Sequence, residues 1–492
     1  MPDATRPAQS PRLRLLTAAG VVILLGGWAV ASLAVGSYFV PGPWTTAVDT
    51  ALLLARGSTW TQILITLLRI CVGFLVGFVT GLAAGMAVGA SRDLAALFKP
   101  LVLFFQGMPP LLWAIPLVAL MGIGHLPTII VIALITFPLV TVTIAEGMST
   151  LPREYGEMLR IFAPGFVPRT RELALPHLAP FIGASVNAGL VLAVKASVTA
   201  EYFGANNGIG FQIQAAYNLL AIHGLFSWAV ILILIILLFN HLLPRLRSAG
   251  PIVKRMFVDK GPVACGIEDI RELKRVFTAL TGSPRIALAG VGFSYRHHPT
   301  LLREVSLDVS SREIAVVTGE SGIGKTTLLK LVASLLSPLE GSVSSPARIG
   351  YVFQDDRLLP WRTVAENTAL PLLYQGFPRK NAFCFAYYLL AEAGLAGEEE
   401  KRPHELSGGM KKRAALARCF ARLPDAILMD EPFTGLHAEA RGSLWAMFLR
   451  LHALHPVPTL IATHFPEEIA SLVPCRLYTL QGKPARLAPA SH

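Results

Sequence analysis

The sequence predicts an all-α membrane domain fused to a soluble α/β domain. The chain has 492 residues, enough for more than one domain, and 53% of them are hydrophobic. The apolar excess is uneven: residues 13–243 form long apolar runs, whereas residues 284–492 have a mixed composition. We therefore expect a membrane domain over residues 1–245, a linker over 246–283 and a soluble domain over 284–492.

Six stretches are long and apolar enough to cross a bilayer, which takes about 20 residues. They are Leu15–Val40, Ile63–Val88, Pro100–Met121, Leu126–Ala145, Ala179–Ala200 and Leu225–Leu243. A cleaved signal peptide is an alternative for the first stretch, because Arg12 and Arg14 precede it. Six spans keep the N-terminus and the soluble half on one side, whereas five would separate them.

Basic residues mark the expected cytoplasmic side of these spans. They precede the first span, follow the last and fill the loop between the fourth and fifth: Arg6, Arg12, Arg14, Arg153, Arg160, Arg169, Arg171, Arg245, Arg247, Lys254 and Arg255. The positive-inside rule places them in the cytosol, with both termini, in a multi-pass protein of the inner membrane in contact with lipid. Nucleic-acid binding is the alternative for the net charge of +12, and no basic stripe with interleaved aromatic residues supports it.

Glycines and prolines recur within the predicted spans. Glycines recur every fourth position in the second span, at residues 73, 77, 81, 85 and 89, so we expect close helix packing on that face. Four prolines interrupt the third and fourth spans: Pro109, Pro110, Pro116 and Pro138. Such prolines are tolerated where neighbouring helices or a cavity satisfy the backbone, which suits a bundle around a pathway.

Arg69, Lys195 and Glu201 lie within or at the edge of apolar spans. Burying such a charge costs about 2.5–3.5 kcal/mol on insertion scales, so each is expected to face a partner or water. Two interpretations stay open: structural pairing, and lining of a translocation path. The five cysteines show no metal-ligand or redox spacing, so we expect ordinary thiols at Cys71, Cys265, Cys384, Cys419 and Cys475.

A glycine-rich loop in the soluble half fits G-x-x-x-x-G-K-[ST], between a strand-like run, REIAVVTG, and a helix-like run, TLLKLVASLL. In this context the loop binds the phosphates of ATP, Lys325 reaches the β/γ oxygens, and Thr326 is placed to ligate Mg²⁺. The loop residues are Gly319, Glu320, Ser321, Gly322, Ile323, Gly324, Lys325, Thr326 and Thr327. About a hundred residues on, AILMDEPF predicts a buried strand whose Asp430 holds the metal, with Glu431 as general base.

With these motifs the chain resembles the ATP-binding cassette (ABC) transporters in which permease and ATPase are fused, and the soluble half resembles a P-loop NTPase cassette throughout. The resemblance implies that Tyr295 in VGFSY stacks on adenine. It also implies that Gln354 in YVFQDD reaches Mg²⁺ and water, and that His464 in LIATHF contacts the γ-phosphate.

The stretch LSGGM resembles the cassette signature, and it opens a basic helix whose N-terminus suits an anion. In the family the signature completes the ATP site of another cassette, so Ser407, Gly408 and Gly409 would close over ATP held by a second copy of the chain. A homodimer is the simplest assembly. Met410 replaces the usual glutamine, and His437 replaces the usual D-loop aspartate, which puts the coupling of the two sites in doubt.

The loop at about residues 145–177 resembles the importer pattern that forms a coupling helix. Glu157 starts it, Ala163 takes the glycine position, and Leu175 with Pro176 ends it in register. The match is partial, and an ordinary cytoplasmic loop is the alternative. Together with RLLPWRTVAEN after Gln354, it resembles importers of nitrate, sulfonate and taurine, which use an external, periplasmic solute-binding protein.

The resemblance thus implies ATP-driven import of a small anion. One alternative is an exporter or lipid transporter, but typical exporters extend their membrane helices far into the cytosol, and no such extension is visible in this sequence. Another is an importer of a thiamine-precursor pyrimidine. A soluble cassette ATPase is a further class, which six spans exclude.

Overall fold

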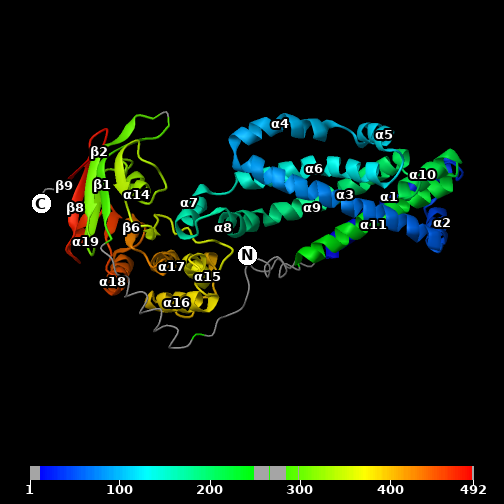
Figure 1. Cartoon of the computed structure of the whole chain (residues 1–492). Helices are drawn as coiled ribbons and strands as arrows, with labels where there is room; N and C mark the ends of the chain where they lie inside the picture. Colours follow the sequence, from blue (N-terminus) through cyan, green and yellow to red (C-terminus); the bar gives the residue numbers. More distant parts are fainter. Residues whose placement is uncertain (1–10, 249–264, 266–283, 297, 490–492) are drawn as a thin grey trace. The chain divides into compact units, whose positions relative to one another are not determined.

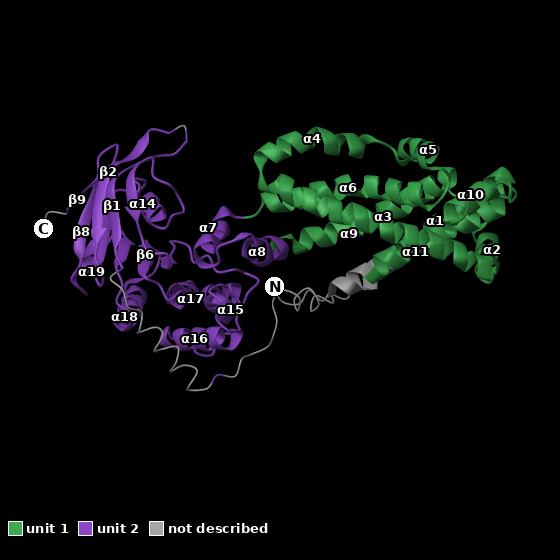
Figure 2. Cartoon of the chain, viewed as in Figure 1, with its two compact units in different colours: residues 1–151, 177–253 green, residues 152–176, 254–492 purple. Residues whose placement is uncertain are grey.

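The computed structural model describes residues 11–248, 265, 284–296 and 298–489 (Figure 1). The chain divides into two compact units (Figure 2). Unit 1 comprises Met1–Leu151 and His177–Val253, and unit 2 comprises Pro152–Pro176 and Lys254–His492. The helix-like stretch IEDIRELKRVFTAL of the predicted linker lies outside the described residues, as does Arg6.

Unit 1 is helical wherever it is regular. Its helices are α1 (Pro11–Val35), α2 (Pro43–Leu54), α3 (Gly57–Ala90), α4 (Arg92–Gly107), α5 (Pro110–Met121), α6 (His125–Ser149), α9 (Leu175–Gly204), α10 (Ile209–Asn218) and α11 (Ile222–Ser248). Within the described ranges, five helices are long and apolar enough to cross a membrane, or up to six if a bent pair is one span.

That bent pair corrects the third predicted span, which is two helices rather than one. α4 and α5 meet at a 90° bend. A proline removes a backbone N–H and restricts the residue before it, so Pro109 and Pro110 end one helix and begin the next. Pro116 and Pro138 lie inside α5 and α6, which continue past them, so the predicted interruption is wrong at those two positions.

The glycine face of α3 packs directly on α6. A Cβ added at any of the five positions would come closer than 3 Å to an atom of α6. At Gly77 it would lie 2.1 Å from Oγ1 of Thr136 and 2.7 Å from the carbonyl oxygen of Ala133. Close helix packing through this face is therefore confirmed for Gly73, Gly77, Gly81, Gly85 and Gly89.

Unit 2 is an α/β body built around two sheets. Its strands are β1 (Ile286–Ser294), β2 (Thr300–Val309), β3 (Ile314–Thr318), β4 (Glu340–Ser344), β5 (Ile349–Val352), β6 (Ala426–Asp430), β7 (Thr459–Ala462), β8 (Arg476–Gln481) and β9 (Arg486–Pro489). Its cassette helices are α14 (Lys325–Val332), α15 (Val364–Tyr374), α16 (Arg379–Glu392), η2 (Pro403–Glu405), α17 (Gly408–Ala421), α18 (Ala438–Leu454) and α19 (Pro466–Ala470).

The larger sheet positions the site. Its order is β5-β6-β7-β3-β8-β9, with parallel neighbours except for the antiparallel β8–β9 pair. The strands β6, β7 and β3 therefore end side by side at one edge, where ligands of open α/β sheets bind. The smaller sheet, β2-β1-β4, is antiparallel. Helices α15, α16 and α17 pack on one another and form a helical cluster.

The segment Pro152–Pro176 groups with unit 2, as the colours of Figure 2 show. We call it the coupling segment. It contains α7 (Arg153–Phe162), α8 (Phe166–Pro168) and η1 (Arg169–Ala174), a stretch of π-helix. The chain then stays helical from Phe166 through Gly204, so this segment runs into α9 without a break.

Two of the five cysteines do not behave as predicted. Cys265 and Cys384 form a disulfide across 119 residues of sequence, whereas Cys71, Cys419 and Cys475 are free thiols. The expectation of ordinary thiols is wrong for this pair, because tertiary structure brings together two residues whose spacing carries no signal.

Candidate functional site

The phosphate loop connects the end of β3 to the start of α14, as the strand–loop–helix pattern predicts. Three of its glycines adopt conformations that side chains rarely take: Gly319 has φ +149°, Gly322 has φ +78° and Gly324 has φ +117°. A Cβ on Gly319 would lie 2.7 Å from the carbonyl oxygen of Leu480, and one on Gly324 would lie 2.9 Å from Cδ2 of Leu302. The loop therefore needs glycine at both positions.

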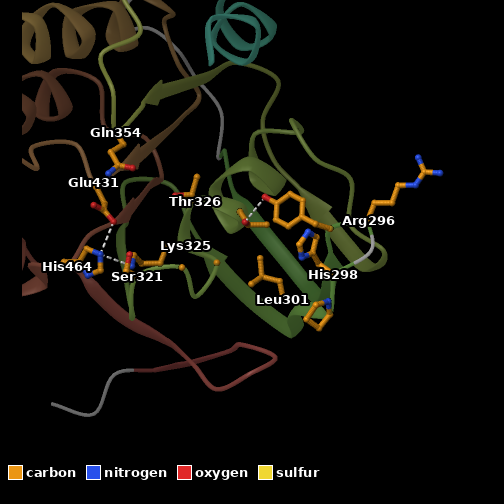
Figure 3. Close-up of a pocket in the computed structure, with 14 residues that line it drawn as sticks. Arg296, His298, Leu301, Ser321, Lys325, Thr326, Gln354, Glu431 and His464 are labelled. Carbon is orange, nitrogen blue, oxygen red and sulfur yellow. Dashed lines mark hydrogen bonds and ion pairs between the residues drawn. The ribbon is translucent and has the colours of Figure 1, made fainter. Parts of the chain in front are cut away.

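A cavity of about 820 Å³ opens against this loop (Figure 3). It is lined by Tyr295, Arg296, His298, Pro299, Leu301, Ser321, Gly322, Gly324, Lys325, Thr326, Thr327, Gln354, Glu431 and His464. Three predicted loop residues lie outside this lining. Gly319 and Glu320 instead offer their carbonyl oxygens to Nζ of Lys325, at 2.8 and 3.0 Å, and Ile323 is buried.

Lys325, His464 and Glu431 converge at one end of the cavity (Figure 3). Nε2 of His464 lies 3.2 Å from Nζ of Lys325 and 3.1 Å from Oε1 of Glu431. Burial lowers the pKa of Lys325, and the nearby carboxylates of Glu431 and Asp430 partly oppose that shift. Glu431 has φ +42°, and its N–H donates to Ala462 of β7 at 2.8 Å, which holds the side chain at the strand edge.

Oxygen ligands for a divalent cation gather next to these groups. Oγ1 of Thr326 donates to Oδ1 of Asp430 at 3.1 Å, and Gln354 lines the same cavity. Asp430 ends β6 as predicted and is buried, and burial raises its pKa although the hydrogen bond from Thr326 opposes the shift. Hydroxyl, carboxylate and amide oxygens are the donors that Mg²⁺ prefers, so the residues present fit this ion.

The far side of the cavity is formed by the turn between β1 and β2. The hydroxyl of Tyr295 lies 3.0 Å from Oγ1 of Thr327, and the tyrosine is 41% exposed. Arg296, His298 and Leu301 line the cavity beside it and were not predicted. Their place directly after Tyr295 in the sequence is the signal that would have found them.

The signature residues are placed away from the cavity of their own chain. Oγ of Ser407 accepts from the N–H of Met410 at 3.3 Å and caps α17, as the predicted helix start requires. Ser407 and Gly408 are exposed, and neither they nor Gly409 belong to the cavity lining. His437 is also exposed, at the start of α18.

In the coupling segment, Glu157 on α7 contacts two cations of the cassette. Oε1 accepts from Nζ of Lys330 on α14 at 2.7 Å, and Oε2 accepts from Arg357 at 2.9 Å. Burial alone would raise the pKa of Glu157, but these hydrogen bonds and charges outweigh it and bring the pKa below its usual value. Leu175 and Pro176 are half-buried at the start of α9.

A second carboxylate of the same segment was not predicted. Glu172, in η1, accepts from the guanidinium of Arg362 on Oε2 and from the hydroxyl of Tyr374 on Oε1 at 2.6 Å. Its backbone carbonyl accepts from Nε1 of Trp361 at 2.9 Å. One sequence signal marks the residue itself: it is the lone acid in the basic run RTREL.

Arg418 links the signature helix to the residues after Gln354. It lies on α17 and is 1% exposed, and it donates to the carbonyls of Arg357 and Asp356 at 2.7 Å each. Its guanidinium lies 5.1 Å from the ring of Phe162 on α7. Burial lowers the pKa of Arg418 to about 10, well above neutrality, so it stays a cation.

The three predicted charges of unit 1 separate into two environments. Arg69 and Glu201 are 1% and 0% exposed and form an ion pair of 2.9 Å. Asn207 and His125 accept further bonds from Arg69, while Thr66 and the N–H of Gly210 donate to Glu201. Lys195, on α9, is exposed.

Both halves of the chain match known families. Residues 302–434 match the family described as ABC transporter, and residues 73–249 match the inner membrane component of binding-protein-dependent transport systems.

Individual relatives match the C-terminal half. The aliphatic sulfonates import ATP-binding protein SsuB 1 of Rhodococcus jostii is 40% identical over 187 residues, covering 37% of this chain and 73% of the relative. The taurine import ATP-binding protein TauB of Roseobacter denitrificans is 39% identical over 198 residues, covering 39% and 74%. A solved post-hydrolysis dimer of the ATP-binding cassette MJ0796 with ADP and Pi aligns at 25% identity and a TM-score of 0.38, covering 42% of this chain and 99% of that chain.

Proposed function

Because this chain belongs to the ABC transporter family, with permease and ATPase fused and ATP hydrolysis coupled to transport, we propose that two copies form an importer of a small organic or inorganic anion. The observation that carries this proposal is the joining of an importer-type permease region to a cassette whose curated relatives serve sulfonate and taurine import. Sulfonate, taurine and nitrate are the candidate substrates, delivered by an external solute-binding protein.

The cavity geometry supports the following roles at the proposed ATP site. Tyr295 stacks on the adenine, and the loop from Gly319 to Thr327 holds the phosphates, with Lys325 on the β/γ oxygens. Thr326, Asp430 and Gln354 would hold Mg²⁺, which neutralises phosphate charge when bound. Glu431 takes a proton from the attacking water, and His464, placed between Glu431 and Lys325, orients that carboxylate and contacts the γ-phosphate.

Two chains are needed for a complete site. Ser407, Gly408 and Gly409 are exposed or partly exposed and do not line their own cavity, so they are free to close over ATP on a second copy. A helix N-terminus and its backbone N–H groups suit the γ-phosphate there. Closure of the two cassettes then acts on the coupling segment through Glu157, with Leu175 and Pro176 leading into α9.

Lys195 is the proposed contact for the anion on the path, because it is exposed on an apolar helix. Arg69 and Glu201 neutralise each other and are buried, so we assign them to the structure of the path rather than to its surface. In the proposed topology, both termini and the cassette are on the cytosolic side of the inner membrane.

The proposal is tested with the full chain in proteoliposomes, with taurine, an alkanesulfonate or nitrate and the matching binding protein outside. We expect the loaded binding protein to stimulate ATP hydrolysis and drive uptake. Export without a binding protein would contradict import, and stimulation by a pyrimidine-loaded protein alone would contradict the anion.

Two variants test the proposed ATPase site. Lys325→Ala should abolish ATP hydrolysis, because the phosphates lose their cation. Glu431→Gln should slow hydrolysis by about a hundredfold or more while leaving ATP bound between two chains. Normal turnover in either variant would overturn the assigned role.

A further inference from the structure

We propose that Glu172 is a positioning residue that fastens the coupling segment to the helical cluster of the cassette, and that this attachment transmits the ATP-driven motion to α9. The inference rests on the proposed function and names a residue that neither the motifs nor the family descriptions assign. It follows from where the two carboxylates of the segment are attached.

The two carboxylates are attached to different parts of the cassette. Glu157 binds Lys330, on the helix that follows the phosphate loop, and Arg357, three residues after Gln354. Glu172 binds Arg362, two residues before the start of α15, and Tyr374, which ends α15. Since α15 packs with α16 and the signature helix α17, a movement of the helical cluster relative to α14 changes the separation of the two attachment points.

The attachment at Glu172 is the more buried of the two. Its side chain is 5% exposed and that of Arg362 is 9% exposed, whereas the side chain of Glu157 is 26% exposed. Both oxygens of Glu172 accept hydrogen bonds, and Nε1 of Trp361 fixes its backbone carbonyl. Bonds to a charged group with this burial are among the stronger ones in proteins.

The attachment also has a mechanical path to the membrane. Glu172 lies in a π-helical turn, a rare geometry that recurs at functional sites. The chain stays helical from this turn to Gly204, so a displacement of Glu172 is carried along α9, where Lys195 lies. Tyr374 reinforces the pair, because burial and its hydrogen bond to Glu172 raise the pKa of the tyrosine and keep its hydroxyl protonated.

The test distinguishes ATP hydrolysis by the cassette from transmission of its motion to α9. The full chain is placed in nanodiscs with a Lys195→Cys reporter, and its reaction with a water-soluble maleimide is measured with and without Mg-ATP and vanadate. Labelling is quantified on the α9 peptide by mass spectrometry, so other cysteines do not interfere. ATP hydrolysis is measured on the same samples.

In the reference chain, ATP and vanadate should change the labelling rate. Glu172→Gln should keep ATP hydrolysis within about twofold and reduce the ATP-dependent change in labelling about tenfold, the scale of one lost hydrogen bond to a charge. Glu154→Gln, an exposed acid on the same segment, is the matched control and should change neither readout. Exchanging the partners, Glu172→Arg with Arg362→Glu, should restore part of the response.

The outcomes are distinguishable. A Glu172→Gln chain that behaves like the Glu154→Gln control, or that loses hydrolysis and labelling response in proportion, overturns the positioning role. A Lys325→Ala chain that still hydrolyses ATP overturns the proposed function instead. If Glu172→Gln does not fold, Glu172→Leu with Arg362→Met removes the pair without leaving an orphan charge. Full ATP-dependent labelling in that double variant would also overturn the proposal.

Discussion

Unit 1 and unit 2 each bury an arginine–glutamate pair, and the two pairs differ in what they join. Arg69 and Glu201 join α3 to α9 within one compact unit, where Thr66 and Asn207 complete the network. Glu172 and Arg362 join the coupling segment to the cassette. Burial and charge are similar, so they alone do not separate a stabilising pair from a transmitting one. Each pair lies within one compact unit, and in our proposal the difference is that the segment carrying Glu172 continues as helix into α9.

The largest expected effect is on the Arg69–Glu201 pair. Arg69→Ala leaves Glu201 buried without its cation, and breaking a buried pair in this way costs about 3–5 kcal/mol of folding free energy. We expect a lower unfolding temperature of the full chain in detergent, followed by tryptophan fluorescence. The double change Arg69→Met with Glu201→Leu should be less harmful, since it leaves no charge unpaired. Equal destabilisation of the single and double variants would contradict this account.

A second prediction sharpens the view that unit 1 is held by close contact. Gly77→Ala puts a methyl group 2.1 Å from Oγ1 of Thr136 and must push α3 from α6, at a cost of about 1–3 kcal/mol. Gly107→Ala is the matched control, because a Cβ there meets nothing within 4 Å. Thermal unfolding of the full chain measures both. The idea of a packed glycine face fails if the two substitutions behave alike.

The smallest effect concerns Glu157 and its pH dependence. Its pKa is lower in the fold than the ordinary value of 4.5, so the folded protein favours the ionised form. The stabilisation is fully present above the ordinary pKa and is lost as the pH falls through the lowered one.

The check compares unfolding temperatures of the full chain and of Glu157→Gln between pH 7 and pH 4. The carboxylate is partly exposed, so we expect a difference of about 1 kcal/mol or less, constant near neutrality and shrinking below about pH 5. A difference that does not change over this range would contradict the ion pairs assigned to Glu157.

Local patterns in the sequence predicted much of this molecule. The glycine spacing predicted a close helix contact on one face of α3, and the phosphate loop was predicted with its flanking strand and helix, because these features depend on neighbouring residues. The bend between α4 and α5 could have been placed more exactly from the two adjacent prolines. By contrast, the helices α2 and α10 were not predicted, because they are too short and too mixed in composition to be recognised as membrane spans.

Contacts distant in sequence were not predictable in the same way. Glu172 is 190 residues from Arg362 and 202 from Tyr374, and Cys265 is 119 from Cys384. No periodicity connects such partners, and only the folded chain brings them together. The pairing of Arg69 with Glu201, 132 residues apart, is a further contact of this kind.

In the proposed two-chain ATP site, the position of Ser407 outside its own cavity has a genetic consequence. Suppose that one copy of the gene carries Lys325→Ala and another carries Ser407→Arg. Neither allele alone yields a working ATP site. A mixed dimer, however, combines the intact phosphate loop of one product with the intact signature of the other, so that one of its two ATP sites works. Two defective alleles would then complement each other in one cell, as alleles of a protein with self-contained sites would not.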